Sequence, residues 1–255
     1  MLESGLGGSS LNWRLVQPKL GKTTRVCAYD RAGMGWSDPS PQPRTPRQIA
    51  DELHTLLTNA GIAGPYVLVG HSLAGKNVRL FALTHPGQVA GMVLVDARSE
   101  YMDANTSAAD TRAFKQALQT QGRLYWVAGR LGIARLFGAT LLGPPSLPVE
   151  TRGPCAVPNP AERDHATTSE GIARASDDGA LQAAPSLGDR PLIVLAAEQT
   201  VAHDPIWLEA QRRLAALSSD SRLIIAEGSG HYIQWDHPTL VIDAVRQVIA
   251  AALQR

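Results

Sequence analysis

The chain has 255 residues, of which 44% are hydrophobic, and this is enough to bury the core of one sizeable α/β domain. Its 24 basic and 23 acidic side chains nearly balance, and no run of lysine or arginine forms a stripe for phosphate groups, which argues against nucleic acid as a partner. The two cysteines are too few for a disulfide framework. No apolar stretch reaches the roughly 18 residues of a membrane span, and the first residues do not have the pattern of a leader peptide. We therefore expect a cytoplasmic protein.

Short apolar runs bounded by turn residues predict the strands of a sheet. They cover residues 25–29, 66–69, 92–95, 192–196 and 222–226. Continuous apolar runs are typical of strands that are buried on both faces. Helical patterns alternate with these runs, so we predict an α/β fold with a mostly parallel sheet flanked by helices.

The clearest helix is predicted over residues 45–60, where Thr45 and Gln48 form a capping box at its start. Its apolar residues recur with the spacing of one helix face. Two further helices are predicted to begin near Asp204 and near Pro238, and both are expected to cover the sheet.

The alternation of strand and helix stops over residues 99–189. Helical stretches are expected there at 110–119 and 124–137, followed by a loop rich in proline. We interpret this segment as a helical cap insertion above the sheet. The first part of the core then covers residues 1–98 and the second part 190–255.

A serine follows the second predicted strand directly, in the sequence Gly70-His-Ser72-Leu-Ala74. A serine at a sharp turn between strand and helix, with small residues two before and two after it, is typical of a nucleophile elbow. Small residues are needed because strand and helix cross closely there. Glycine is usual where this chain has Ala74, which adds one methyl group at the crossing. This context predicts that Ser72 is a nucleophile.

Together with two other fragments, this motif resembles the α/β-hydrolase superfamily. The run GLGGSSLNW over residues 5–13 is similar to the oxyanion loop of that family, and YDRAGMGWSD over 29–38 is similar to the turn after its fourth strand. The motifs stand in the family's order, and the resemblance covers nearly all of the chain except the cap. It implies the α/β-hydrolase fold and a serine hydrolase of the esterase or lipase type.

A serine hydroxyl needs a neighbouring imidazole to take its proton, and the same imidazole later protonates the leaving group. His231 follows the last predicted strand, on the loop where the resembled family carries its catalytic histidine. We therefore predict that His231 is the base. By resemblance, the backbone amides of Leu6 and Leu73 form the oxyanion hole.

The acid that orients the imidazole has two possible locations in the family, each after a different strand. We favour Asp96, which follows the strand over 92–95 at the carboxyl edge of the sheet. At the other location, the usual aspartate position is closest to Thr200. The alternatives to Asp96 are Glu198, Asp204 and Asp103, and Asp204 also has the position of a helix cap.

The family's oxyanion loop follows a central strand that is itself preceded by two more strands. Met1-Leu-Glu-Ser4 leave almost no room for them. We therefore expect a truncated or misassigned start, and any signal or membrane anchor of a longer form would lie outside this sequence. Restored upstream residues are expected to raise soluble yield and activity.

The predicted function is a serine hydrolase, most simply a carboxylesterase, that acts on a small-molecule acyl substrate through an acyl-enzyme. Serine in place of an aspartate nucleophile argues against epoxide hydrolase and haloalkane dehalogenase chemistry. A perhydrolase, a carbon-carbon hydrolase or a non-catalytic ligand-binding or receptor-like protein on this fold are the alternatives.

The apolar cap run over 131–142 fits a core or an acyl pocket. No metal or nucleotide motif is present, so no cofactor or metal is expected, and the sequence carries no signal for the oligomeric state.

Overall fold

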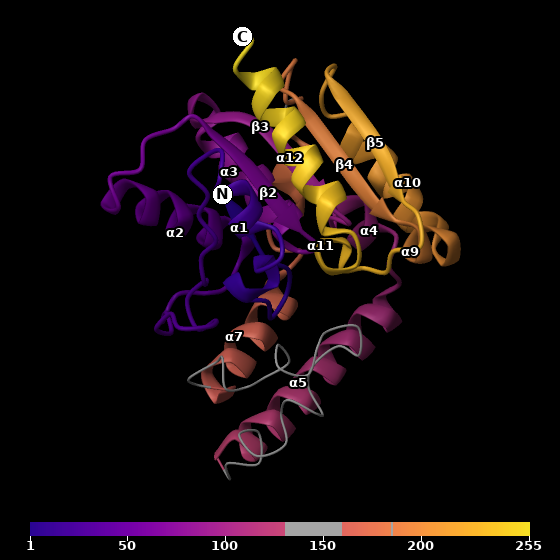
Figure 1. Ribbon diagram of the computed structural model, residues 1–255. Helices are drawn as coiled ribbons and strands as arrows, with labels where there is room; N and C mark the ends of the chain where they lie inside the picture. Colours follow the sequence, from indigo (N-terminus) through magenta and orange to yellow (C-terminus); the bar gives the residue numbers. More distant parts are fainter. Residues whose placement is uncertain (131–159, 185) are drawn as a thin grey trace.

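The structure of the chain, a computed structural model, describes residues 1–130, 160–184 and 186–255 (Figure 1). This part of the chain contains a parallel sheet of five strands in the spatial order β1-β2-β3-β4-β5. The strands are Leu2–Glu3 (β1), Tyr66–His71 (β2), Val89–Val95 (β3), Leu192–Ala197 (β4) and Ser221–Ala226 (β5). Four of the five apolar runs that predicted strands are confirmed, and the sheet is parallel as expected.

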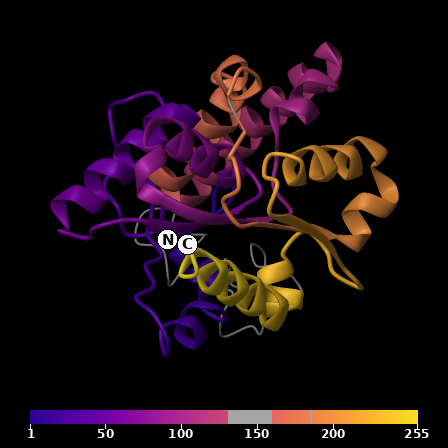
Figure 2. The same cartoon turned by 90° about the horizontal axis from the view of Figure 1, so that it is seen from above.

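Helices cover both faces of the sheet (Figure 2). One face carries α1 (Gln17–Leu20), α11 (Ile233–Asp236) and α12 (Pro238–Ala252), and the other carries α2 (Pro46–Asn59), α3 (Ala74–Thr84) and α10 (Pro205–Ala215). The remaining short helices of the core are η1 (Ser10–Trp13), η2 (Pro86–Gln88) and α9 (Glu198–His203). Within the described ranges, none of the helices is both long and apolar enough to cross a bilayer.

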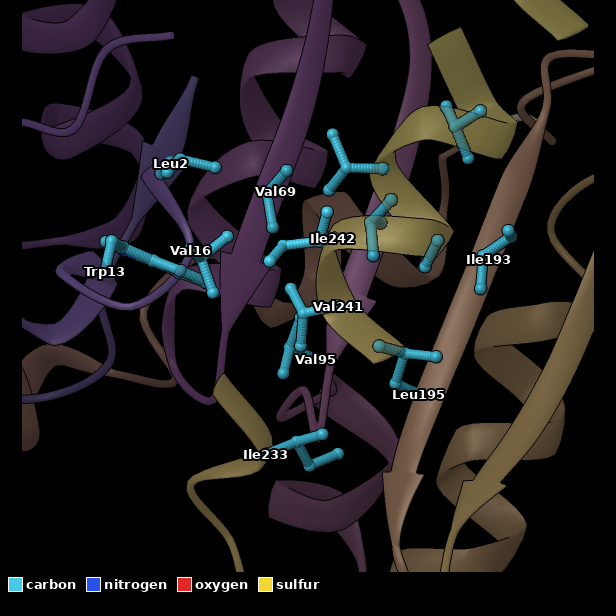
Figure 3. Close-up of a cluster of buried hydrophobic side chains, with 14 of the residues drawn as sticks. Leu2, Trp13, Val16, Val69, Val95, Ile193, Leu195, Ile233, Val241 and Ile242 are labelled. Atoms are coloured by element: carbon cyan, nitrogen blue, oxygen red, sulfur yellow. The ribbon is translucent and has the colours of Figure 1, made fainter. Parts of the chain in front are cut away.

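Side chains of the central strands alternate between the two faces. Val93 and Val95 of β3 pack in the cluster under α12, whereas Met92 and Leu94 pack in the cluster that includes α2 and α3. Figure 3 shows the first cluster, in which Val95 lies next to Val241 of α12. Because both faces are buried, these strands have the continuous apolar sequences that predicted them.

Residues 25–29 do not form the predicted strand. Of these residues only Ala28 forms a bridge, to Leu2 of β1, whose N–H donates to the carbonyl oxygen of Cys27 at 2.8 Å. The first residues, which were expected to leave almost no room for a central strand, form only the two-residue β1, which lies between Ala28 and β2. With only two residues, β1 pairs with little of the neighbouring segment. A cavity of about 500 Å³ lies at this point, lined in part by residues 65–67.

The predicted helix starts are confirmed. The side-chain oxygen of Thr45 accepts the N–H of Gln48 at 3.1 Å, and the carboxylate of Asp204 accepts the N–H of Ile206 at 2.9 Å. Such caps satisfy N–H groups that have no partner within the first helical turn. The last helix begins at Pro238, as expected.

Between β3 and β4 the described chain is helical. Its helices are α4 (Glu100–Ala104), α5 (Ala108–Arg130), α7 (Pro160–Ala173) and α8 (Asp178–Gln182). Figure 1 shows α5 and α7 side by side, projecting from the core. The break expected between residues 119 and 124 is wrong, because α5 continues through Gly122, and one glycine costs a helix only about 1 kcal/mol. Residues 131–137 of the second expected helix, the apolar run to residue 142 and most of the proline-rich loop lie outside the described residues.

Candidate active site

Ser72 lies at the sharp turn between β2 and α3, where its backbone has a φ of 53°. This left-handed conformation costs a non-glycine residue on the order of 1 kcal/mol. Three backbone hydrogen bonds hold it. The Ser72 N–H donates to the Val95 carbonyl at 3.0 Å, and the Ser72 carbonyl accepts the N–H groups of Gly75 and Arg98 at 3.0 and 2.9 Å. A Cβ on Gly70 would lie only 2.8 Å from the carbonyl oxygen of Ala74. Glycine is therefore needed where the strand passes the helix.

Three residues of the predicted catalytic set meet at the carboxyl edge of the sheet. Ser72 follows β2, Asp96 follows β3, and His231 lies on the loop after β5. The Oγ of Ser72 is 2.9 Å from Nε2 of His231, and Nδ1 of His231 is 2.6 Å from Oδ2 of Asp96. The strands are parallel, so residues that are far apart in the sequence converge at one edge. In this geometry the imidazole can accept the serine proton while its other nitrogen donates to the carboxylate.

Asp96 is fully buried and adopts a left-handed conformation with a φ of 41°. Besides His231, its carboxylate accepts the N–H of Ala197 at 3.1 Å, the hydroxyl of Thr200 at 3.1 Å and the indole N–H of Trp207 at 2.9 Å. A buried carboxylate requires such donors because it has lost its water. The bond from Trp207 joins residues 111 positions apart, so no local sequence pattern indicated it. The hydroxyl of Thr200, which stands closest to the family's usual acid position, is thus bonded to the carboxylate of Asp96, which follows the neighbouring strand β3.

The alternative acids have other partners. The carboxylate of Glu198 accepts a backbone N–H of the His231 loop at 2.7 Å, and that of Asp204 caps α10. Asp103 forms ion pairs with Lys76 and Arg98. In the described part of the chain, none of the three forms a hydrogen bond with His231.

His71, directly before Ser72, holds the loop that carries His231. Its Nε2 lies 2.9 Å from the carbonyl oxygen of His231, so this nitrogen carries a proton and donates it. Burial, and secondly the neighbouring His231, hold the pKa of His71 well below its usual range, and the ring is therefore neutral. His71 stands next to the serine in the sequence motif, but a bond between residues 160 positions apart leaves no local pattern.

The amides expected in the oxyanion hole belong to two segments that meet at Ser72. Leu73 follows Ser72 at the amino end of α3. The glycine loop, residues 5–8, contacts the same turn, because a Cβ on Gly5 would lie 2.8 Å from the Cβ of Ser72. Among the described residues, neither the N–H of Leu6 nor that of Leu73 has an acceptor. An oxyanion hole requires N–H groups that are not used within the protein.

A buried ionic cluster next to the glycine loop was not indicated by the sequence. Glu3 of β1 accepts a hydrogen bond from Asn77 at 2.6 Å and lies 3.8 Å from Arg31. Burial raises the pKa of Glu3 to about 7, against the opposing charge of Arg31. Glu3 therefore takes up a proton within the physiological pH range.

Replacing Glu3 with glutamine is expected to make the free energy of unfolding less sensitive to pH between 5 and 8. The folded protein binds this proton up to about pH 7, whereas the unfolded chain releases it near 4.5, so native stability falls as the pH rises between these values. The difference between the pKa of Glu3 in the folded and in the unfolded protein corresponds to about 3 kcal/mol of folding free energy. Urea unfolding of both proteins at pH 5 and pH 8 measures the difference, and an equal pH dependence would contradict the assignment.

The chain is similar to a known protein family and to several curated proteins. A family model described as alpha/beta hydrolase fold matches residues 1–238. An uncharacterized protein of Schizosaccharomyces pombe, C23C11.06c, is 39% identical over 132 residues, which is 50% of this chain and 23% of that protein. The chain spans less than a quarter of the length of the first curated relatives that it matches.

Two solved structures are similar over almost the whole chain. A thermophilic esterase from Thermogutta terrifontis has a TM-score of 0.75 at 21% identity, covering 98% of this chain and 89% of its own. A putative epoxide hydrolase from Pseudomonas aeruginosa, solved as a point mutant, has a TM-score of 0.76 at 20% identity, covering 99% and 89%. At such low identity the similarity shows the fold alone.

Proposed function

The chain belongs to the α/β-hydrolase family, and on that premise we propose that it is a serine hydrolase that cleaves carboxylic esters or related acyl compounds through an acyl-enzyme. The observation that carries the proposal is the hydrogen-bonded series from Ser72 through His231 to the buried Asp96. Two residues of this series, Ser72 and Asp96, have a strained backbone with a positive φ. Strain of this kind is typical of functional sites, which supports an enzyme over an inactive scaffold.

In the proposed reaction, the Oγ of Ser72 attacks the acyl carbonyl carbon while its proton passes to Nε2 of His231. The carbonyl oxygen becomes negative and is stabilised by the N–H groups of Leu6 and Leu73. The bond to the leaving group then breaks, and His231 returns the proton to the departing oxygen. A water molecule, deprotonated by His231, hydrolyses the acyl-enzyme and restores Ser72. Asp96 stabilises the imidazolium form of His231 in both halves of the reaction.

The nucleophile separates this proposal from epoxide hydrolysis, the activity in the description of one similar structure. Epoxide opening by a carboxylate gives an ester that water can cleave. Opening by Ser72 would give an ether, and an activated water does not cleave an ether readily. The serine therefore favours acyl substrates. Perhydrolysis and carbon-carbon bond cleavage use the same residues and differ in the substrate.

A substrate panel tests the proposed class. Aryl esters of increasing acyl length, a thioester, an anilide and a terminal epoxide are compared with the same protein preparation. We expect turnover of at least one ester and none of the epoxide. Ligand binding to the wild-type protein without turnover of any acyl compound would instead support a receptor-like protein.

We also propose that residues 99–189 act as a cap at the substrate site, between core segments 1–98 and 190–255. Two described helices of this stretch, α5 and α7, project from the core on the side of α4, α9 and α11, which follow the carboxyl ends of β3, β4 and β5 (Figure 1). One of them, α7, contacts the glycine loop: a Cβ on Gly7 would lie 3.1 Å from the side chain of Thr167. The cap thus reaches the segment that carries the proposed oxyanion donor Leu6.

A further inference from the structure

Arg31 comes from the turn motif over residues 29–38, which the proposed reaction does not use. Its guanidinium is buried, with an exposed fraction of 3%, and it donates to the carbonyl oxygens of Ser4 and Gly5, the latter at 2.8 Å. A buried arginine that binds two successive carbonyls fixes the orientation of two successive peptide planes. Both planes lie at the start of the glycine loop.

The same guanidinium forms a bidentate pair with a cap residue. Its Nε and Nη2 lie 2.8 and 2.9 Å from the carboxylate oxygens of Glu170 on α7, and Glu170 is fully buried. Arg44 also faces this carboxylate, at 3.9 Å. Paired planar groups of this kind hold a fixed geometry, which a lysine could not reproduce.

The face of α7 that carries Glu170 also packs against the glycine loop. Thr167 lies against Gly7, and a Cβ on Gly171 would lie 3.5 Å from the side chain of Leu6. Residues 167, 170 and 171 share one helix face because they are separated by three and four positions. Arg31 is therefore the charged centre of a contact between cap helix and loop.

The neighbouring residue of the motif holds the other end of the loop. The carboxylate of Asp30 accepts the N–H of Ser10 at 2.6 Å and the N–H of Trp36 at 3.0 Å. A Cβ on Gly35 would overlap this carboxylate, so the glycine of the motif leaves room for it. Arg31 and Asp30 thus form hydrogen bonds with the two ends of the segment from Ser4 to Ser10.

We propose that Arg31 is a positioning residue for the oxyanion hole, which it couples to the cap through Glu170. The inference rests on the proposed function. In a trans peptide the C=O and N–H groups point in opposite directions, so the bond from Arg31 to the Gly5 carbonyl directs the N–H of Leu6 away from Arg31. We infer that this direction is toward Ser72, which the loop contacts at Gly5. Docking of α7 then sets the donor geometry.

Kinetics of Arg31→Met on a short aryl ester test this inference. We expect kcat to fall by about 100-fold, the effect of losing one oxyanion donor, with KM changed less than about threefold. The inhibition constant of an alkyl trifluoromethyl ketone, which forms a tetrahedral adduct with the serine, is expected to rise by about the same factor as kcat falls. Glu170→Gln, which keeps the shape but removes the charge, is expected to lower kcat by about 10-fold.

The matched control is Arg79→Met, which removes another buried, bidentate arginine pair, to Glu100 at 2.6 and 2.9 Å, without touching the glycine loop. Its kcat is expected to stay within about twofold of wild type if the effect is specific to the loop. Hydrogen exchange adds a readout that does not depend on activity: residues 4–8 are expected to exchange faster in Arg31→Met than in Arg79→Met.

If Arg31→Met does not fold, the double variant Arg31→Met/Glu170→Met removes both partners of this ion pair and gives the same test. Wild-type kcat, ketone inhibition and loop exchange in a folded variant would overturn the inference while the hydrolase proposal stands. A wild-type protein that turns over no acyl compound would contradict the hydrolase proposal instead, and in that case loop exchange alone still tests whether Arg31 holds the loop.

Discussion

Ser72→Ala is expected to lower kcat for an aryl ester by about 10⁴-fold or more, with KM changed little. The substitution removes the only atom that forms the acyl-enzyme bond in the proposed reaction. Steady-state kinetics on the best ester of the substrate panel measures the loss. The residual rate reflects binding and the oxyanion donors alone.

Ser219→Ala is the matched control for this substitution. Ser219 is an exposed serine that precedes β5, at the amino end of that strand, and its hydroxyl lies 3.3 Å from the carbonyl oxygen of Gly188. The kcat of the Ser219→Ala variant is expected to equal that of the wild-type protein. The folded stability of Ser72→Ala is also expected to be close to wild type, because alanine and serine meet similar steric limits at a positive φ. Full ester turnover by folded Ser72→Ala would exclude Ser72 as the nucleophile.

Asp96→Asn is expected to lower kcat by about 10⁴-fold at neutral pH, again with a small change in KM. An asparagine fits the same space but can donate its amide hydrogen to Nδ1 of His231. The proton of the neutral ring then sits on Nε2, and this nitrogen can no longer accept the proton of Ser72. Kinetics over pH 5 to 9 measure the loss.

Glu198→Gln and Asp204→Asn are the controls for the acid. Both are expected to retain kcat within about threefold, because neither carboxylate touches His231 in the described structure. Asparagine also caps helices well, so Asp204→Asn should change the free energy of unfolding by less than about 0.5 kcal/mol. If one of these controls loses activity and Asp96→Asn does not, the acid is misassigned.

Asp96, the proposed acid, illustrates how far the sequence can predict this site. Asp96 and Thr200 follow β3 and β4, which are neighbouring strands, so both residues lie at the same edge of the sheet. The order of residues along the chain does not distinguish them. Only the side-chain distances do: Thr200 donates to Asp96, and Asp96 is the residue next to His231.

Local patterns predicted most of the fold because they report local physics. Buried strands are continuously apolar, and helix starts require a cap, so β2, β3, β4, α2 and α10 were found from sequence. The edge strand β5 was also found, although it is only partly buried. The segment over 25–29 is also apolar, but a strand requires a partner, and β1 offers only two residues. The sequence of a segment does not show whether a neighbouring strand is long enough to pair with it.

The contacts of Arg31 could not be predicted for the same reason. Arg31 and Glu170 are 139 positions apart, and neither lies in a pattern that specifies the other. The motif around Arg31 was visible, but its bonds to the Ser4 and Gly5 carbonyls depend on how the loop folds back. Long-range pairing of this kind required the three-dimensional structure.

Covalent labelling of the wild-type protein with a fluorophosphonate, followed by intact-mass measurement and peptide mapping, tests directly whether Ser72 is the nucleophile. We expect one phosphonyl group per chain, located on Ser72, and much slower labelling of His231→Ala because the serine then has no base. A protein that is not labelled under conditions that label a control serine esterase, or that carries the group on another residue, would show that Ser72 is not the nucleophile.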